Sequence, residues 1–201
     1  MQENKELPHY KYILPHLYRN METIPKESKI LDMGCGKGWV TNYLYELGFK
    51  NIIGSDVNKK HLEIASGNFP NLKFINISGA DNNLKKMYKN YFDVIISIEV
   101  IEHIYEPHIF IDNCFEILKY NGILFLSTPY HRYLKNLIIS LSGKFDNHFQ
   151  PLNKYGHIKF WSKNTIRKLL YKQGFKVGEI KGAGRLPYLW KTMVTVAKKD
   201  S

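Results

Sequence analysis

Short apolar runs alternate with amphipathic segments through residue 130 of the chain. The amphipathic segments predict helices, because their apolar residues recur at helical spacing, and the apolar runs are typical of buried strands. Alternating elements of this kind predict a parallel, doubly wound sheet that binds its ligand at the carboxyl ends of the strands. The predicted helices are 8–22, 39–48, 58–68 and 107–119, and the predicted strands are 29–31, 51–56, 72–77, 91–98 and 121–129.

The last quarter of the chain has a different pattern. WSKNTIRKLLYKQGF (161–175) is amphipathic and predicts a helix that Gly174 ends, and two strand-like runs follow it, FKVGEIKGAG (175–184) and KTMVTVAK (191–198). These runs predict a closing hairpin with an antiparallel strand. We therefore expect an α/β fold with a mostly parallel, seven-stranded sheet. No repeat or linker divides residues 1–201, so one domain is expected, with a substrate-side insertion at 129–164.

Polar side chains break the apolar strands at one kind of position, the carboxyl end. Asp32, Asp56, Glu99, Ser127 and Thr128 all stand there. In a parallel sheet these ends meet at one edge, so the sequence predicts a polar site along that edge.

Composition narrows the class of protein and its surroundings. Hydrophobic content of 44% and charged content of 23% are globular values. No apolar run is long enough for a membrane span, and the first residues lack a signal-peptide pattern. Two distant cysteines, Cys35 and Cys114, favour a reducing compartment, so we expect a cytoplasmic protein. The sequence does not predict an oligomeric state.

The chain is basic, with 29 Lys and Arg against 18 Asp and Glu and a net charge of +11. This excess favours an anionic partner such as nucleic acid, anionic lipid or a phosphorylated substrate. The alternative is that scattered lysines serve solubility, because no run of five or six like charges occurs.

A glycine-rich loop, DMGCGKG, follows the first predicted strand. Gly34, Gly36 and Gly38 allow the backbone to approach a ligand closely. Asp56 ends the next strand, where a carboxylate can accept both hydroxyls of a ribose. The competing hypothesis, a dinucleotide-binding dehydrogenase, expects G-x-G-x-x-G, whereas this loop has G-x-G-x-G.

Four segments between about residues 28 and 130 together resemble class I S-adenosylmethionine-dependent methyltransferases. ILDMGCGKGWVTNYL resembles motif I of that family, GSDVN motif II, FDVIISIEVIEHI motif IV, and LKYNGILFLSTP the strand that follows. The resemblance implies S-adenosyl-L-methionine as cofactor. It further implies the cofactor-binding residues Asp32, Gly34, Cys35, Gly36, Gly38, Asp56, Val57, Ser78 and Ile98.

These implied contacts divide the cofactor among the strand ends. Asp32 and the backbone of 34–38 would hold the methionine end, Asp56 the ribose, and Val57 the adenine. The chain departs from the family after the third strand, in NISGADNN, where the family often has an aspartate near adenine. Ser78 takes that place here, with Asp81 as a neighbour.

The stretch SIEVIEHIYEP places three functional side chains after the fourth strand. Glu99, Glu102 and His103 stand at i, i+3 and i+4, so a helical turn would direct them to one side. Their oxygen and nitrogen donors suit Mg²⁺, Mn²⁺ or Zn²⁺. Two alternatives remain open at this stage: His103 acts as a base, or these residues cap the next helix and pair with lysines.

The same stretch carries a narrower resemblance. E-x-x-E-H, with a later histidine in KYGHIKFWS, resembles the ubiquinone-biosynthesis O-methyltransferases (methyltransferase type 11, 12 and 23 domains) and the small-RNA 3′-terminal 2′-O-methyltransferases. The resemblance implies Glu99, Glu102, His103 and His157 as metal ligands, and His103 and Glu102 as catalytic residues. The expected activity is O-methylation of a small molecule, namely a quinol or phenol, a sugar or a lipid-linked acceptor. The alternatives are a metal-assisted RNA 2′-O-methyltransferase and a non-catalytic module that binds S-adenosylmethionine.

Residues 129–164 mix aromatic, basic and apolar side chains, and LKNLIISL predicts a short helix within them. Four hypotheses compete for this segment. It is a lid over an aromatic or lipid-linked substrate, a patch that contacts a membrane surface, a nucleic-acid surface, or a lid helix with ordinary core contacts. The expected partner is a small acceptor, anionic or lipid-linked, with nucleic acid as the less favoured choice.

Overall fold

Helices and strands alternate along the computed structural model, which describes residues 10–143, 146, 152 and 156–200. The first half comprises α2 (Leu14–Met21), β1 (Ile30–Met33), α3 (Trp39–Glu46), β2 (Ile52–Asp56), α4 (Lys59–Asn68), β3 (Lys73–Asn76), α5 (Asn83–Tyr88) and β4 (Phe92–Ile98). The second half comprises η1 (Ile101–His103), α6 (Pro107–Ile117), β5 (Leu118–Pro129), α7 (Tyr133–Leu141), α9 (Lys163–Lys172), β6 (Phe175–Ala183) and β7 (Thr192–Lys199).

The strands form one seven-stranded sheet in the order β3-β2-β1-β4-β5-β7-β6. Strands β1 to β5 pair in parallel, and β7 pairs antiparallel with both β5 and β6. The sheet is therefore mixed, mostly parallel, with one antiparallel hairpin. The predicted α/β class, seven strands and closing hairpin are confirmed.

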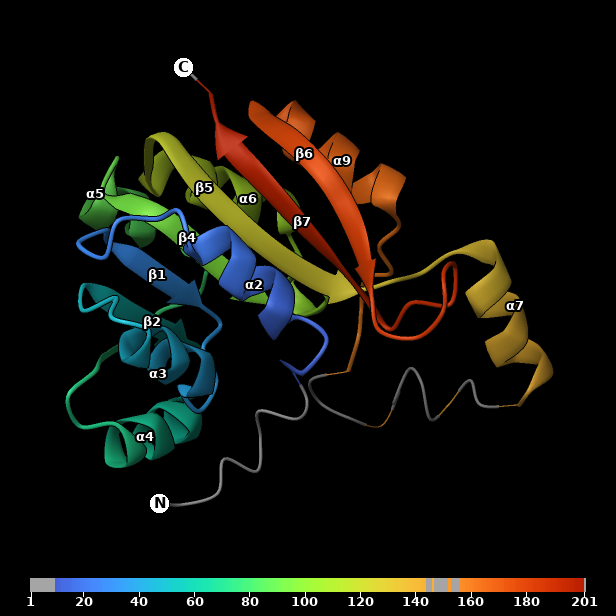
Figure 1. The fold of residues 1–201 in the computed structure, drawn as a ribbon, viewed down its shortest axis with the longest axis horizontal. Coiled ribbons are helices and arrows are strands. Elements are labelled where there is room, and N and C mark those ends of the chain that lie inside the picture. Colours follow the sequence, from blue (N-terminus) through green and yellow to red (C-terminus); the bar gives the residue numbers. More distant parts are fainter. Residues whose placement is uncertain (1–9, 144–145, 147–151, 153–155, 201) are drawn as a thin grey trace.

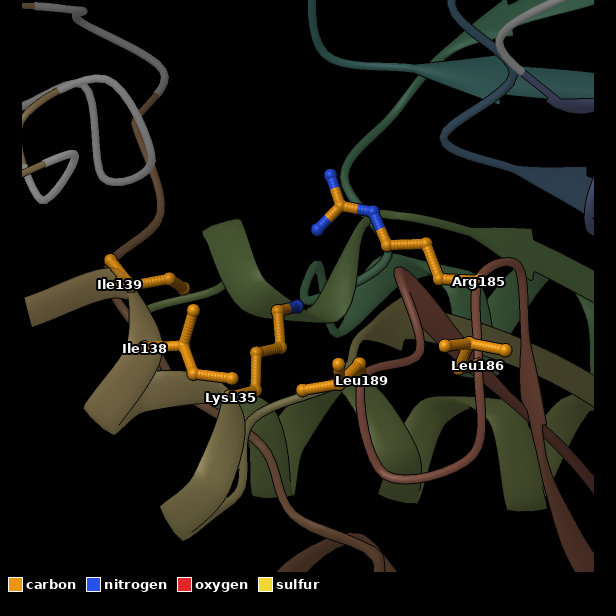
Figure 2. Close-up of a pocket in the computed structure, with 6 residues that line it drawn as sticks. All are labelled: Lys135, Ile138, Ile139, Arg185, Leu186 and Leu189. Atoms are coloured by element: carbon orange, nitrogen blue, oxygen red, sulfur yellow. The ribbon is translucent and has the colours of Figure 1, made fainter. Parts of the chain in front are cut away.

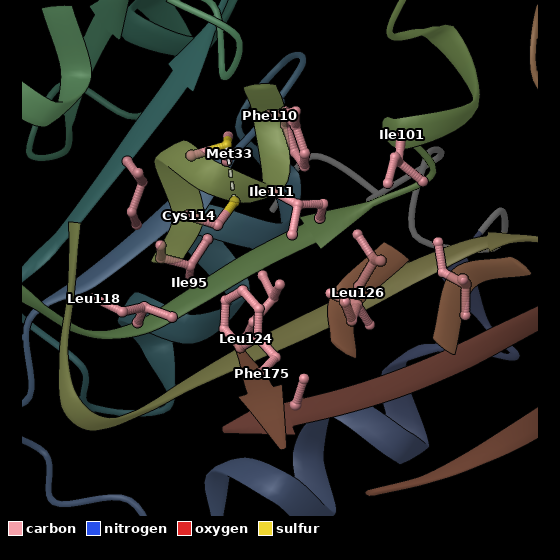
Figure 3. Close-up of a cluster of buried hydrophobic side chains, with 14 of the residues drawn as sticks. Met33, Ile95, Ile101, Phe110, Ile111, Cys114, Leu118, Leu124, Leu126 and Phe175 are labelled. Atoms are coloured by element: carbon pink, nitrogen blue, oxygen red, sulfur yellow. Dashed lines mark hydrogen bonds between the residues drawn. The ribbon is translucent and has the colours of Figure 1, made fainter. Parts of the chain in front are cut away.

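One face of the sheet carries α5, α6 and α9. Leu31 and Met33 of β1, with Leu124 and Leu126 of β5, point into a core that contains Phe110 of α6 and its neighbours (Figure 3). Each of these side chains is at most 1% exposed. Burying this much apolar surface provides the main stabilisation of the fold.

The opposite face carries α2 and α3, and α4 lies beside α3 (Figure 1). Residues that alternate with the first set point this way, such as Ile30 of β1 and Phe125 of β5, and they meet Leu17 of α2 and Leu44 of α3. The central strands are thus buried on both faces, and this explains why their sequences are almost wholly apolar.

Several predicted elements differ from the structure at their ends. The predicted helix 8–22 begins at Leu14, next to Pro15 in its first turn, and residues 8–9 lie outside the described residues. Strand β5 begins at Leu118 rather than 121. The helix within 161–175 begins at Lys163, because the Ser162 hydroxyl accepts the amide of Thr165 and so caps α9. Helix α5 was not predicted, because six residues hold too little periodicity.

Helix α7, predicted from LKNLIISL, stands at the carboxyl end of β5 and projects beyond the sheet (Figure 1). Tyr133, Leu134 and Leu141 of this helix are exposed. Within the described ranges no helix combines the length and apolar character of a bilayer span.

Candidate active site

The site forms where the chain changes direction across the sheet. Strands β2 and β3 lie on one side of β1, whereas β4 and the later strands lie on the other. In an open α/β sheet the crevice at this switch point is where ligands bind. The glycine loop leaves β1 there, and the Glu99–His103 stretch leaves β4 beside it.

The first part of the glycine loop is anchored to β2 and packed against the segment that follows β4. The amides of Gly34 and Cys35 donate to the Ser55 carbonyl at 2.7 and 2.9 Å. Gly34 has φ +82°, and a Cβ placed there would lie 2.3 Å from Cγ2 of Val100. Val100 lies between Glu99 and Glu102, so the loop and the acidic stretch are in direct contact.

Gly36 lies at the open part of the loop, where a Cβ would meet nothing within 4 Å. Its amide donates to Oδ2 of Asp56 at 2.9 Å, and the Asn58 amide donates to Oδ1 at 2.8 Å. Two backbone amides thus orient the Asp56 carboxylate, and each oxygen keeps a lone pair for a further donor. This arrangement has room for a ribose whose hydroxyls donate to Asp56.

Asp32 lies beneath the loop and is only 2% exposed. The Thr41 hydroxyl of α3 donates to its Oδ2 at 2.6 Å. Burial raises the pKa of Asp32 to about 7, and the Thr41 hydrogen bond opposes that rise. Burial also raises the pKa of the Cys35 thiol, so this cysteine is a poor nucleophile.

The remaining residues implied for the cofactor lie around this loop. Val57 is 60% exposed directly after Asp56, as an adenine-packing residue would be before the cofactor covers it. Ile98 is buried at the end of β4. Ser78 accepts the Ala80 amide and Asp81 the Asn83 amide, so both side chains also shape the turn that leads to α5.

Glu99 ends β4 in a left-handed conformation, with φ +55°. A non-glycine residue there is strained, and such strain is concentrated at functional sites. Its Oε1 accepts the Ser127 hydroxyl at 2.9 Å and the Thr192 hydroxyl at 2.7 Å. Burial raises the pKa of Glu99, and those two hydrogen bonds work against the rise.

Glu102, His103 and His157 form a cluster, which we call the Glu-His cluster. One ligand atom from each lies within 4.8 Å of the other two. The His103 and His157 rings are 5.1 Å apart between centroids. Glu99 lies outside this group, because η1 spans only residues 101–103 and the expected shared helical face does not form.

Backbone contacts bring residue 157 to the cluster from a distant part of the chain. The amides of Ile158 and Lys159 both donate to the Glu102 carbonyl at 3.0 Å. The Gly156 carbonyl lies 3.2 Å from Nδ1 of His103. A carbonyl can only accept, so Nδ1 carries the proton and Nε2 of the neutral ring keeps its lone pair.

The Glu-His cluster has unused polar capacity. Glu102 is 1% exposed, and its Oε2 accepts the Thr128 hydroxyl at 3.0 Å. Its Oε1 and Nδ1 of His157 are buried and have no hydrogen-bond partner among the residues that the structure describes. Burial and the nearby Glu99 raise the pKa of Glu102 well above the usual value, whereas burial, His103 and Lys135 lower that of His157. Buried polar atoms are rarely left unpaired, so these atoms indicate a ligand.

Several polar residues lie at the site although the sequence alone gave them no role there. Thr41 and Thr192 are buried hydroxyls that position carboxylates, and neither stands at a strand's carboxyl end. Lys135 is a lysine inside the apolar run LKNLIISL and is 4% exposed. A lone charge in an apolar run was the one signal that could have identified it.

Comparisons with known proteins agree with this geometry. A family model described as a methyltransferase domain matches residues 6–180. The ubiquinone biosynthesis O-methyltransferase of Pelagibacter ubique is 28% identical over 159 residues, which cover 78% of this chain and 65% of that protein. The enzyme of the same name from Rickettsia canadensis is 29% identical over 173 residues, 85% of this chain and 72% of that protein.

Among solved structures, the fold resembles a chain from the complex of the Haloferax volcanii Trm112 methyltransferase activator with a methyltransferase. The TM-score is 0.79 at 16% identity, with 98% of this chain and 92% of that chain covered. Identity this low supports a shared fold alone.

Proposed function

Because the chain belongs to the methyltransferase domain family and is an S-adenosylmethionine-dependent enzyme, we propose that it methylates a hydroxyl oxygen of a small acceptor. The observation that carries the proposal is the Glu-His cluster beside the glycine loop, joined to it through the contact of Val100 with Gly34. The names of the relatives, which are O-methyltransferases, support the same acceptor chemistry.

The cofactor side follows from the loop geometry. Asp56 accepts the ribose hydroxyls, and the open backbone at Gly36 admits the cofactor without displacing a side chain. Asp32 provides a buried carboxylate below the methionine end. When bound, S-adenosylmethionine supplies an electrophilic methyl group on a sulfonium. Its transfer is an in-line displacement, so the protein chiefly positions the acceptor oxygen.

The acceptor side must remove a proton, because a hydroxyl is a poor nucleophile until it is deprotonated. Nε2 of His103 has the lone pair for this step, since Nδ1 donates to Gly156. Oε1 of Glu102 lies 3.9 Å from Nε2 and, when ionised, stabilises the imidazolium that forms. The backbone of residues 156–159 holds both residues in place, because it hydrogen-bonds to the Glu102 carbonyl and to Nδ1 of His103.

The cluster also fits a divalent metal. Glu102, His103 and His157 would hold it, with Glu99 next to them, and two imidazoles favour Zn²⁺ or Mn²⁺ over Mg²⁺. A bound ion would lower the pKa of an acceptor hydroxyl by Lewis-acid polarisation. Ligand and base are alternative roles for His103, and a chelator distinguishes them.

Labelled S-adenosylmethionine and catechol test the proposal. We expect label in an O-methyl group, and we expect transfer to stop with a chelator and return with added Mn²⁺ or Zn²⁺ if the metal is bound. His157→Ala should then reproduce the chelated enzyme, while His108→Ala, at an exposed position on α6, should not. If methyl transfer continues in the presence of the chelator, the metal hypothesis is wrong and His103 remains as the base. Label that enters RNA, or no acceptor across a broad screen, contradicts the proposed function.

A further inference from the structure

A largely apolar cavity of about 430 Å³ lies between α7 and the loop that joins β6 to β7 (Figure 2). Four of its lining side chains are aliphatic and two are cationic. The lining residues are Lys135, Ile138, Ile139, Arg185, Leu186 and Leu189. None of them belongs to the cofactor loop or to the Glu-His cluster.

Lys135 holds its ammonium at the inner end of this cavity although it is only 4% exposed. Nζ donates to the Tyr130 carbonyl at 2.6 Å and to the Lys191 carbonyl at 3.3 Å. An ammonium has three protons, so one remains for a ligand within the described part of the chain. Two neutral carbonyls fix the ammonium in place, and the nearby Glu99 carboxylate offsets part of its charge, whereas Arg185 and Lys191 add positive charge around it.

Arg185 faces the same space from the opposite wall. The two cationic groups reach toward one another in Figure 2. Burial lowers the pKa of Lys135, and the neighbouring Arg185 lowers it further. Two like charges that line one cavity repel one another. An anion between them removes the repulsion and gains charge-assisted hydrogen bonds from both.

Consecutive residues at the start of β7 link the cavity to Glu99, which precedes the Glu-His cluster in the chain. Lys135 binds the carbonyl of Lys191, and the next residue, Thr192, donates to Glu99. Burial and His103 lower the pKa of His157, and the charge of Lys135 lowers it further. A hydroxylated molecule bound in the cavity could therefore extend toward the Glu-His cluster, which would accept the proton of its hydroxyl.

We propose that this cavity is the acceptor's specificity subsite and that the acceptor is an amphipathic anion. Its carboxylate or phosphate binds Lys135 and Arg185, and its aliphatic part lies against the four aliphatic side chains. The inference rests on the proposed function, because it treats the cavity as part of the methyl-acceptor site. It adds a substrate class, a hydroxylated and hydrocarbon-bearing acid, that the Glu-His cluster alone does not imply.

Binding of simple probes tests the subsite without any methyl transfer. Octanoate, octyl phosphate, octanol and octylammonium share one chain and differ in head group, and ligand-observed NMR or calorimetry measures each. We expect both anions to bind at least about tenfold more tightly than octanol, because one charge-assisted hydrogen bond increases affinity by about that factor. Whichever anion binds more tightly identifies the head group. Equal binding of octanol, or tighter binding of octylammonium, overturns the proposal.

Arg185→Gln is the main variant, because this side chain is exposed and its loss leaves the core intact. It should reduce octanoate binding toward that of octanol, whereas Arg167→Gln, at an exposed arginine of α9, should not. Lys135→Met keeps the length of the side chain and should have the same effect, with circular dichroism reporting whether it folds. Unchanged anion affinity in Arg185→Gln contradicts the subsite.

Methylation of catechol, which carries neither a chain nor an anion, separates the two proposals. If the protein methylates catechol but binds none of the anions, the proposed function stands and the subsite is ruled out. If the protein binds the anions but methylates no acceptor, the cavity remains an anion site, while the proposed function and the cavity's assignment to a methyl acceptor are both removed.

Discussion

The two sides of the site satisfy their polar atoms differently. On the cofactor side, both oxygens of Asp56 accept backbone amides and Oδ2 of Asp32 accepts Thr41. On the acceptor side, Oε1 of Glu102 and Nδ1 of His157 are buried without a hydrogen-bond partner in the described part of the chain. The carboxylates of the cofactor side are therefore held by hydrogen bonds before a ligand binds, whereas the Glu-His cluster keeps a carboxylate oxygen and an imidazole nitrogen ready for one. Among the described residues, Oγ of Ser55 and Nε1 of Trp39 on the cofactor side are also buried without a hydrogen-bond partner.

The two sides also differ in how the chain assembles them. Residues 32–58 form the cofactor side within one strand–helix–strand unit. The acceptor side joins Glu99 to Thr192, a separation of 93 residues, and residues 102–103 to residues 156–159. Changes on the cofactor side should alter cofactor affinity, whereas changes in the Glu-His cluster should alter turnover and leave that affinity unchanged.

The largest effect should come from His103→Ala. Losing a general base costs about 100- to 10,000-fold in rate, so methyl transfer should fall by that much while cofactor affinity stays at the wild-type value. Steady-state kinetics and cofactor titration measure the two quantities, with His108→Ala as the matched control. Near-normal turnover in His103→Ala would contradict both roles assigned to this residue.

Asp32→Asn should change how stability depends on pH. Asp32 has a folded pKa of about 7 against 3.8 for the free group, so the folded protein binds an extra proton between about pH 4 and pH 7. The contribution of Asp32 to the free energy of unfolding therefore falls as pH rises through that window and is constant above it. Relative to wild type, the variant should gain on the order of 4 kcal/mol from pH 4 to pH 8.

Urea unfolding without cofactor at several pH values measures this difference. Other titrating groups are shared by both proteins and cancel. Parallel stability curves would mean that Asp32 ionises as freely in the folded chain as in the unfolded one.

Asp56→Ala should weaken cofactor binding. The change removes a carboxylate from charge-assisted hydrogen bonds, which contribute about 1.5–3 kcal/mol, so the dissociation constant should rise about 10- to 100-fold. Calorimetry with S-adenosylmethionine measures it, with Asp112→Ala on α6 as the control. Clear binding of NAD with none of S-adenosylmethionine would instead support a dehydrogenase.

Ser162→Ala should have the smallest effect and should separate stability from chemistry. Ser162 caps α9, which begins just after the residues that carry His157 to the cluster. Losing the cap should cost about 1 kcal/mol of unfolding free energy and leave cofactor affinity unchanged. Thermal unfolding checks the first and titration the second, with Ser140→Ala on α7 as a control that removes no cap. A change in cofactor affinity would contradict the separation of the two sides.

The sequence alone determined the sheet and the cofactor side because both arise from local patterns. Apolar runs such as 91–98 are typical of strands buried on two faces, and the order of strands and helices restricts the topology to few choices. Asp32, the glycines and Asp56 could be placed because a strand–turn–helix–strand unit brings them together by itself.

Only the tertiary structure decided the acceptor side. Glu99 and Glu102 are three residues apart, yet a left-handed residue and a single 3₁₀ turn separate them, which helical spacing does not predict. His157 reaches the site because the next two backbone amides donate to the Glu102 carbonyl, and Lys135 reaches it because its ammonium donates to the Lys191 carbonyl. Contacts of this kind depend on how the packed sheet positions the ends of β4, β5 and β7, and no periodicity in the sequence records them.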